Sequence, residues 1–502
     1  MKSLKYLYIC RSENFFLTFY RLSLLKISQL AVRSYLYYDY YWFKFVNKKR
    51  LLRISYANHL QKSVKKNHRY LILIFLKGAL DLLSILIQRL KEKLSQPRPV
   101  WEKNLIVLWF GTFMAGIGFS LVMPFMSLYI DTLGNFSSQA LNLWSGLAFS
   151  ATFLVTTLIS PWWGRLADQK GRKLMLLRAS LGMAVVISLM GLVTNVYQLV
   201  GLRLLQGIFS GYVSNATALV ATGTPKARSG QVLGTLATGA VTGQLLGPLL
   251  GGLTATAFGY RTTFFITGTI LFIVFILSLL FVHEEFTPVE KEALQPASAI
   301  LKELKYPKVV LGMFITTMII QASNNSISPI ISLYIRQLLG GHGNVTLVSG
   351  IIASIPGIAT LIAAPRMGRL GDRIGSERIL AAGLILAIFV YLPMAFVTNV
   401  WQLGALRFLI GVSDACLLPA VNSLITKYSP HHAAGRIFSY NQSFQATGNV
   451  FGPMIGSSIS SFFGYRGVFI STSFLVLLNY LLVRKNTADI RRHRQNNENT
   501  GN

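Results

Sequence analysis

The chain has 502 residues, of which 52% are hydrophobic and only 13% are charged. Soluble domains carry about 25% charged residues, so this composition excludes an ordinary soluble protein and favours one that crosses a membrane many times. The two cysteines, Cys10 and Cys416, are too few for a disulfide framework and match no metal-ligand spacing.

Residues 1–104 form a basic extension. They hold 21 Lys and Arg against 5 Asp and Glu, and so carry +16 of the chain's net charge of +31. The segment has no nucleic-acid-binding pattern, and we expect no nucleic-acid partner. Residues 70–90 are apolar, but Lys77 and Asp81 interrupt them, which favours an interfacial helix over a thirteenth span. The extension is therefore either interfacial, lying on anionic lipid headgroups, or an artefact of the gene model.

Twelve apolar segments, each long enough to cross a bilayer, follow this extension. They cover about residues 105–130, 143–163, 174–193, 197–220, 231–254 and 262–282 in the first half, and 308–335, 346–366, 379–397, 401–424, 437–460 and 466–483 in the second. We predict an all-α membrane protein with two six-helix bundles, at 105–282 and 308–485. A linker at 283–307 joins them, and a polar tail follows at 486–502.

The two halves repeat each other. Residues 124–130 (PFMSLYI) return as 329–335 (PIISLYI) at an offset of 205, and residues 164–168 (GRLAD) return as 368–372 (GRLGD) at an offset of 204. A repeat of this length built from apolar segments is typical of secondary transporters, whose halves rock against each other around a central site.

Positive charges sort the loops into two sets. One set is rich in Lys and Arg, whereas the other holds little beyond Asp131, Arg261, Arg336 and Arg466. The positive-inside rule places the first set, both termini and the 283–307 linker in the cytoplasm. The linker is short and highly charged, which favours a tether over a catalytic domain.

The loop after the second segment has a pattern that predicts a conformational latch. It contains Gly164, Asp168, Gly171, Arg172 and Lys173, and a partial copy with Gly368 and Asp372 recurs in the second half. A carboxylate at Asp168 can pair with cytoplasmic arginines and face the positive N-terminus of a helix in the other half. The alternative is a loop that only obeys the positive-inside rule, which does not require this spacing.

The fifth segment carries a run of small residues around a proline: Gly243, Gly247, Pro248, Gly251 and Gly252. Small residues four apart let helices approach closely, and a proline bends a helix and frees a backbone carbonyl. Packing alone is one interpretation of this run.

Three charged residues fall within the predicted spans. Arg203 and Arg407 occupy equivalent positions in the fourth and tenth segments; each marks a functional site by default, or snorkels to the nearby interface. Of the twelve acids beyond residue 104, Asp414 alone lies in the middle of a span, two turns from Arg407 on one helix face. Its equivalent in the first half is Ser210. We favour a proton carrier at Asp414 over a structural salt bridge or a polar contact between helices.

Neutral amides accompany Met and aromatic side chains within the spans. Such surfaces adapt to varied ligands and suit a large amphiphilic substrate better than a sugar. We predict a central cavity lined by Met123, Phe125, Gln244, Gln321, Asn324, Asn325, Asn441 and Gln442.

These motifs resemble those of the major facilitator superfamily. Residues 164–173 are similar to its signature loop, with Gln169 departing at a variable position; residues 243–252 are similar to its antiporter motif, and residues 203–207 to its R-x-x-Q-G motif. The resemblance covers about residues 100–485, without the N-terminal extension, and is closest to the drug:proton antiporter branch with twelve spans.

The resemblance implies a monomeric multidrug efflux transporter that works by alternating access and underlies antibiotic resistance. Drug-like compounds, protons and the lipid bilayer are its implied partners, and the proton gradient replaces any cofactor. Its implied location is the cell membrane, or the inner membrane of a cell with two. We expect no metal.

Other functions remain as alternatives. A symporter that imports a metabolite has the same architecture. An enzyme is disfavoured because no histidine lies in any span and no acid pair or nucleophile–base pattern occurs. A scaffold protein would not need the latch pattern.

Overall fold

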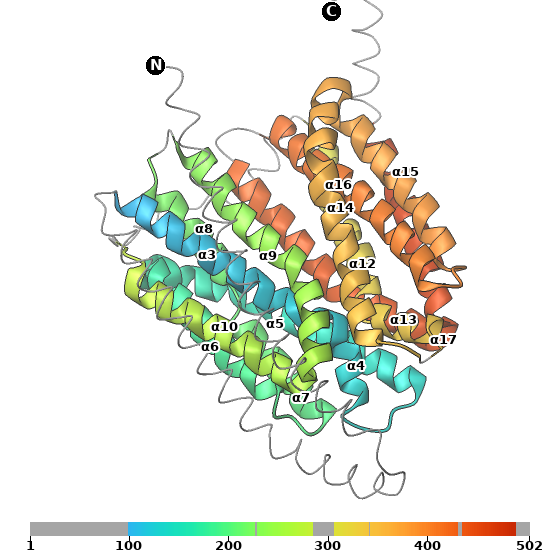
Figure 1. The fold of residues 1–502 in the computed structure, drawn as a ribbon. Helices are drawn as coiled ribbons and strands as arrows, with labels where there is room; N and C mark the ends of the chain where they lie inside the picture. The colour runs from blue at the N-terminus through green and yellow to red at the C-terminus, as the bar shows by residue number, and fades with distance from the viewer. Residues whose placement is uncertain (1–98, 226–227, 285–305, 341, 430–433, 488–502) are drawn as a thin grey trace, which may run out of the picture. The chain divides into compact units, whose positions relative to one another are not determined.

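The computed structural model describes residues 99–225, 228–284, 306–340, 342–429 and 434–487, and every regular element in these ranges is a helix (Figure 1). The basic extension up to residue 98, most of the 283–307 linker and the end of the polar tail lie outside the described residues.

The elements of the first half for which the structure describes the full bounds are eight α-helices and one short 3-10 helix. They are α3 (Val100–Leu121), η1 (Met123–Phe125), α4 (Met126–Asp131), α5 (Ser138–Lys170), α6 (Arg172–Met190), α7 (Val196–Ile208), α8 (Tyr212–Gly223), α9 (Ser229–Phe258) and α10 (Tyr260–Phe281).

The described part of the second half contains α12 (Pro307–Ile327), α13 (Ile331–Leu338), α14 (Val345–Ile374), α15 (Ser376–Met394), α16 (Val400–Tyr428) and α17 (Ala434–Asn486). Gly464 divides α17 into two arms, because its φ of 68° and ψ of −179° are not helical.

Each of the twelve predicted segments coincides with these helices, although several boundaries differ. The first described helix, α3, begins at Val100, so residues 100–104 belong to it and not to the basic extension. Both α5 and α14 extend further than predicted. They end directly before Gly171 and Gly375, whose φ angles of 93° and 103° favour glycine. The predicted latch sequences therefore lie largely on helix ends.

The helices are those of a multi-pass membrane protein. Within the described ranges, nine helices are long and apolar enough to cross a membrane, with α17 counted once. The fourth predicted span is missing from this set because it is divided into the short helices α7 and α8. The seventh is missing because Gln321, Asn324 and Asn325 make α12 more polar.

A repeated sequence explains where two equivalent helices begin. Asn195 precedes α7 and Asn399 precedes α16, and their side chains accept hydrogen bonds from the backbone N–H groups of Gln198 and Gln402 at 2.9 Å. Each asparagine satisfies a backbone donor that has no partner within the helix. The shared Asn-Val-x-Gln-Leu pattern is thus a helix-capping motif.

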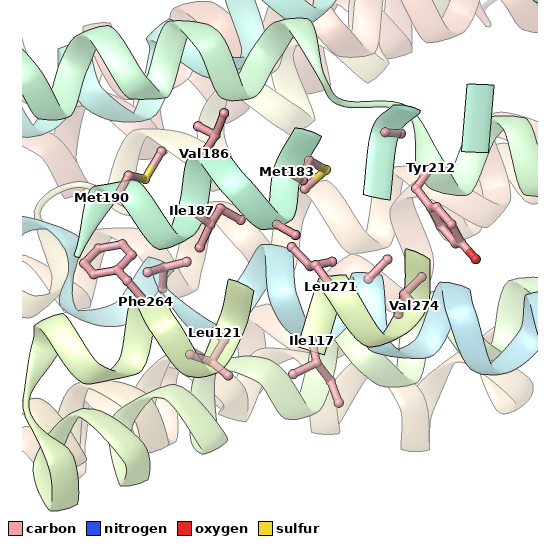
Figure 2. Packing of buried hydrophobic residues seen from close by; sticks show 14 of the residues in the cluster. Ile117, Leu121, Met183, Val186, Ile187, Met190, Tyr212, Phe264, Leu271 and Val274 are labelled. Atoms are coloured by element: carbon pink, nitrogen blue, oxygen red, sulfur yellow. The ribbon is translucent and has the colours of Figure 1, made fainter. Parts of the chain in front are cut away.

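Each half has its own apolar core. In the first half, Ile187 of α6 and Phe264 and Leu271 of α10 are almost fully buried between α3, α6 and α10 (Figure 2). In the second half, α12 packs against α17, and α15 packs against both α16 and α17. Leu380, Tyr391 and Phe469 belong to that core.

The most extensive contacts between the two halves join α5 with α17 and α9 with α14, and the shorter helices α4 and α13 also meet. The described hydrogen bonds between the halves lie between the end of the helices opposite the 164–173 loop and the middle of the helices. They join Ser127 to Pro329, Gln139 to Ser461, Ser150 to Val450, Thr256 to Asn344, and Tyr260 to Thr346. The described structure is therefore closed at this end.

Candidate functional site

Asp414 lies at the midpoint of α16 and is held by residues from two other helices. Its carboxylate Oδ1 accepts a hydrogen bond from Asn324 Nδ2 of α12 at 3.0 Å. Asn324 Oδ1 in turn accepts a hydrogen bond from the hydroxyl of Tyr391 in α15 at 2.8 Å. Three helices of the second half thus build the surroundings of one acid, and we call Tyr391, Asn324 and Asp414 the polar triad.

Arg407 lies two turns before Asp414 on α16, but no ion pair joins these two residues, both of which the structure describes. The Arg407 Nε is buried and has no hydrogen-bond partner. Of the structural contacts that the sequence allows at Asp414, the salt bridge is therefore not formed, whereas a polar contact between helices is. The carboxylate is bound by an amide instead.

Arg203 lies in α7 and connects it to α5. Its Nε donates to the Ala148 carbonyl at 2.8 Å and its Nη1 donates to Gln206 Oε1 at 2.8 Å. The guanidinium also lies 5.9 Å from the centre of the Phe149 ring. Arg203 is only 1% exposed, so it does not snorkel to an interface. Its contacts are those of a buried brace within the first half.

The fourth span is interrupted at the position that corresponds to Asp414. Helix α7 ends at Ile208 and α8 begins at Tyr212, and between them Gly211 has a φ of 106°. The equivalent helix α16 continues through Asp414 without a break. Such a break leaves backbone carbonyls without helical partners, which is costly in a membrane.

Two side chains that the sequence analysis did not select satisfy these carbonyls. Arg178 of α6 donates to the carbonyls of Ile208 at 3.3 Å and Ser210 at 2.7 Å. Trp163 Nε1 of α5 donates to the same Ile208 carbonyl at 2.9 Å, and the Arg178 guanidinium lies 3.7 Å from the centre of the Trp163 ring. Gly211 is the feature of the sequence that could have indicated the break, because glycine adopts a positive φ without strain.

The start of α6, within the predicted latch, is capped by an acid from the far end of the same half. Glu284 follows α10, and its two carboxylate oxygens accept hydrogen bonds from the backbone N–H groups of Arg172 and Lys173, each at 2.7 Å. A carboxylate is stabilised at a helix N-terminus because the helix dipole is positive there. The side chains of Asp168 and Asp372 lie outside the described residues.

The glycine run of α9 faces two neighbours. A Cβ at Gly243 or Gly251 would collide with the backbone of α3, at Phe113 and Leu121. On another face, Gly252 lies against Gly350 of α14, in the second half. Close packing is thus one role of this run, and contact between the halves is another.

The predicted cavity residues differ in their surroundings. Phe125 is fully buried and stacks on Tyr260 with ring centres 5.4 Å apart, so it belongs to the core and does not line an open cavity. Asn441 is also buried, and its Oδ1 has no hydrogen-bond partner. Gln244 and Gln442 are exposed, and the remaining members are half-buried: Met123, Gln321, Asn324 and Asn325.

Asn325 binds across to the arm of α17 that precedes Gly464. Its Nδ2 donates to Asn449 Oδ1 at 2.9 Å and to the carbonyl of Gln321 at 3.0 Å. Adjacent residues of α12 therefore serve different helices, because Asn324 turns towards Asp414 while Asn325 turns towards α17.

An apolar groove also lies between the end of α15 and the start of α16. Its lining includes Leu392, Phe396 and Leu406. It contains none of the predicted site residues, so we take the polar triad, and not this groove, as the candidate functional site.

Comparisons with known proteins agree with this architecture. The sequence profile of the Major Facilitator Superfamily matches residues 108–341 and 313–500. Multidrug resistance protein MdtG of Enterobacter lignolyticus is 52% identical over 379 residues, which cover 76% of this chain and 91% of the relative. The protein of the same name from Dickeya zeae is also 52% identical, covering 76% of this chain and 93% of the relative.

Solved structures share the fold at low sequence identity. A bacterial homologue of the human lysosomal transporter Spinster, in an inward-facing and occupied conformation, has a TM-score of 0.66 and 13% identity, covering 78% of this chain and 97% of that one. The nucleoside transporter NupG has a TM-score of 0.61 and 14% identity, covering 77% and 99%. The repeated six-helix halves, the signature loop and these matches place the chain in the major facilitator superfamily.

Proposed function

We propose that this protein exports drug-like compounds from the cytoplasm in exchange for protons, by alternating access. The two relatives above support the substrate class, since both are named multidrug resistance proteins. The observation that carries the coupling mechanism is Asp414, held at the middle of α16 by an amide.

Asp414 has the chemistry of a proton carrier. An ionised carboxylate at the centre of a bilayer helix costs about 2.5–3.5 kcal/mol on insertion scales, and binding a proton removes that charge. A permanent partner such as an arginine would keep the carboxylate ionised in every state. Here Asn324 binds it instead, and an amide can hydrogen-bond both the ionised and the protonated acid.

Arg407 and Arg203 have complementary parts in this proposal. Arg407 lies two turns from Asp414 on the same helix, so its positive charge attracts the ionised carboxylate, and its Nε lacks a partner in the described state. Arg203 braces α5 against α7, so that the first half moves as a unit. Coupling thus depends on the second half, around Asp414.

The described state has the site open towards the cytoplasm in this scheme, because the contacts between the halves gather at the opposite end. A substrate would contact the half-buried and exposed members of the predicted set: Met123, Gln244, Gln321, Asn325 and Gln442. Asn441 would join them when the helices move.

The 164–173 loop acts as a latch in the alternative, outward-facing state. Asp168 would pair with cytoplasmic arginines and face the positive N-terminus of a helix in the other half when the cytoplasmic ends close, and Asp372 would act in the same way in the second copy of the loop. Gly164 and Gly368 leave room for the approach, since a Cβ at either glycine meets nothing within 4 Å in the described state. A contact made in only one state shifts the equilibrium by its full free energy. Asp168→Asn should therefore lower transport without lowering the amount of protein in the membrane.

The proton gradient supplies enough energy for efflux. One proton that enters down a potential of 100 mV releases about 2.3 kcal/mol, which supports a substrate gradient of about fiftyfold. We place the protein in the cell membrane, or the inner membrane of a cell with two, with both termini in the cytoplasm, and expect it to work as a monomer without enzymatic activity.

Transport into inverted membrane vesicles tests the proposal. When the vesicle lumen is more acidic than the medium, vesicles that contain the protein should accumulate a fluorescent cationic dye. A protonophore should abolish the accumulation. Release of the dye under the same gradient would indicate a symporter, and chemical conversion of the dye would indicate an enzyme. A drug-susceptibility panel with and without the gene extends the test to substrates.

A further inference from the structure

An ion pair joins the two halves at the closed end. Asp131 is the last residue of α4 in the first half, and Arg336 lies near the end of α13 in the second. Arg336 Nη1 lies 2.6 Å from Asp131 Oδ2. The Asp131 side chain is 34% exposed and the Arg336 side chain 39%, so water reaches the pair.

The repeat gives this pair its significance. Residues 124–130 correspond to residues 329–335, so the next residue of each run, Asp131 and Arg336, occupies the same position in its own half. Equivalent positions of two related halves meet near the axis that relates them. Two identical charges would repel each other there, whereas the opposite charges of Asp131 and Arg336 attract.

A second contact lies one helical turn away. The hydroxyl of Ser127, which is 1% exposed, donates to the carbonyl of Pro329 at 2.6 Å. Tyr465, at the turn of α17, packs against both cores. A buried hydrogen bond and a hydrated ion pair thus connect the same two segments, and we call Ser127, Asp131, Pro329 and Arg336 the outer junction.

We propose that the outer junction is the gate that closes this end of the transporter, and that the Asp131–Arg336 ion pair stabilises the closed state of this gate. Every contact of the junction crosses between the halves, so opening this end must break all of them. Those contacts exist in one state and not in the other, which gives them direct control of the equilibrium between the two. This inference does not depend on what the protein transports.

The exposure of the pair suits a gate that opens in every cycle. Partly exposed ion pairs contribute little, so removing this one should raise the population of the state open at this end by about 2- to 5-fold. Salt on that side screens the pair and should act in the same direction. A fully buried pair would be far harder to break and would trap the closed state.

Cysteine labelling tests the gate without any transport assay. Ser150→Cys places a reporter between the halves, where Ser150 is 2% exposed and bonds to the Val450 carbonyl. The native cysteines are replaced (Cys10→Ser, Cys416→Ser), and a membrane-impermeant maleimide is added from the side of the outer junction. The rate of labelling then reports how often this end opens.

Asp131→Asn and Arg336→Gln should each raise the labelling rate by about 2- to 5-fold. The exchanged pair Asp131→Arg/Arg336→Asp should return it to within about twofold of the parent, because it restores the attraction. Arg466→Gln is the matched control, since it removes one exposed arginine near Tyr465 and leaves the pair intact; it should change nothing.

Two results would overturn the proposal. The first is an unchanged labelling rate in both single variants when they are inserted in normal amounts. The second is acceleration in the single variants that the exchanged pair does not reverse, which would make the effect one of general destabilisation. Neither result depends on drug export, so failure of the gate and failure of the proposed function can be told apart.

Discussion

The hydroxyl of Tyr391 fixes the orientation of the Asn324 amide. It donates to Asn324 Oδ1 at 2.8 Å, which leaves Asn324 Nδ2 to point at the carboxylate of Asp414. Without this hydroxyl the amide could turn its oxygen towards Asp414 whenever the acid is protonated and can donate. A tyrosine in α15 therefore determines which group an acid in α16 encounters.

Tyr391→Phe should change the pH dependence of transport more than its maximal rate. The Tyr391 hydroxyl holds the Asn324 amide as a donor to Asp414, which favours the ionised acid. Without the hydroxyl the amide oxygen can also accept from the protonated acid, so the protonated form gains a partner. We expect gradient-driven dye uptake to reach its half-maximum at a higher external pH, with near-normal protein abundance. Tyr480→Phe, in α17 of the same half, controls for the loss of a hydroxyl. Identical pH profiles for the two variants would show that the triad does not set protonation.

Asp414→Asn should uncouple transport from the proton gradient and leave substrate binding measurable. The amide keeps the shape and the hydrogen bond with Asn324 but cannot exchange a proton. Inverted vesicles that contain this variant should show no gradient-dependent uptake, while binding of the same dye in detergent changes less than about threefold. Full gradient-dependent uptake would mean that Asp414 is structural.

Arg178→Lys should destabilise the first half. Lysine keeps the charge, but it lacks the planar fork that reaches two carbonyls and stacks on Trp163. One unsatisfied buried acceptor costs about 1–3 kcal/mol, so the melting temperature in detergent should fall by several degrees. Trp163→Phe removes the donor to the Ile208 carbonyl but still places an aromatic ring beside Arg178, so it should lower the melting temperature by less. Equal stability of parent and Arg178→Lys would indicate that water satisfies the broken helix.

The sequence could predict the position of each span and the unusual place of Asp414, because both follow from the pattern along the chain. Apolar runs mark the spans, and an acid within one of them is conspicuous. The alignment of the two halves also paired Asp414 with Ser210, where the structure has a helix break in place of an acid.

The partners of Asp414 could not be predicted in the same way. Whether Asn324 or Asn325 turns towards Asp414 depends on the rotation of α12 about its axis, which packing against α16 and α17 determines. Tyr391 looks like any other core tyrosine in the sequence. Phe125 was misplaced in the cavity for a similar reason, since an aromatic residue suits a binding surface and a core equally well.

Glu284 was assigned to a tether because it lies in a charged linker sequence, yet it caps α6 within the latch. Its two hydrogen bonds, both 2.7 Å long, connect the end of α10 to the start of the third span. Nothing in the local sequence indicates a contact between residues more than 110 positions apart.

Glu284→Gln should loosen this connection. The glutamine side chain has one acceptor oxygen and no charge, so it can satisfy only one of the two backbone donors, at Arg172 or Lys173, and loses its attraction to the helix dipole. The expected loss of stability is about 1 kcal/mol. It should appear as faster hydrogen exchange at residues 172–175, measured by mass spectrometry, with little change elsewhere. Glu102→Gln, which alters an acid in the first turn of α3, is the matched control. Uniform protection of residues 172–175 in parent, variant and control would mean that the carboxylate contributes nothing to holding the start of α6.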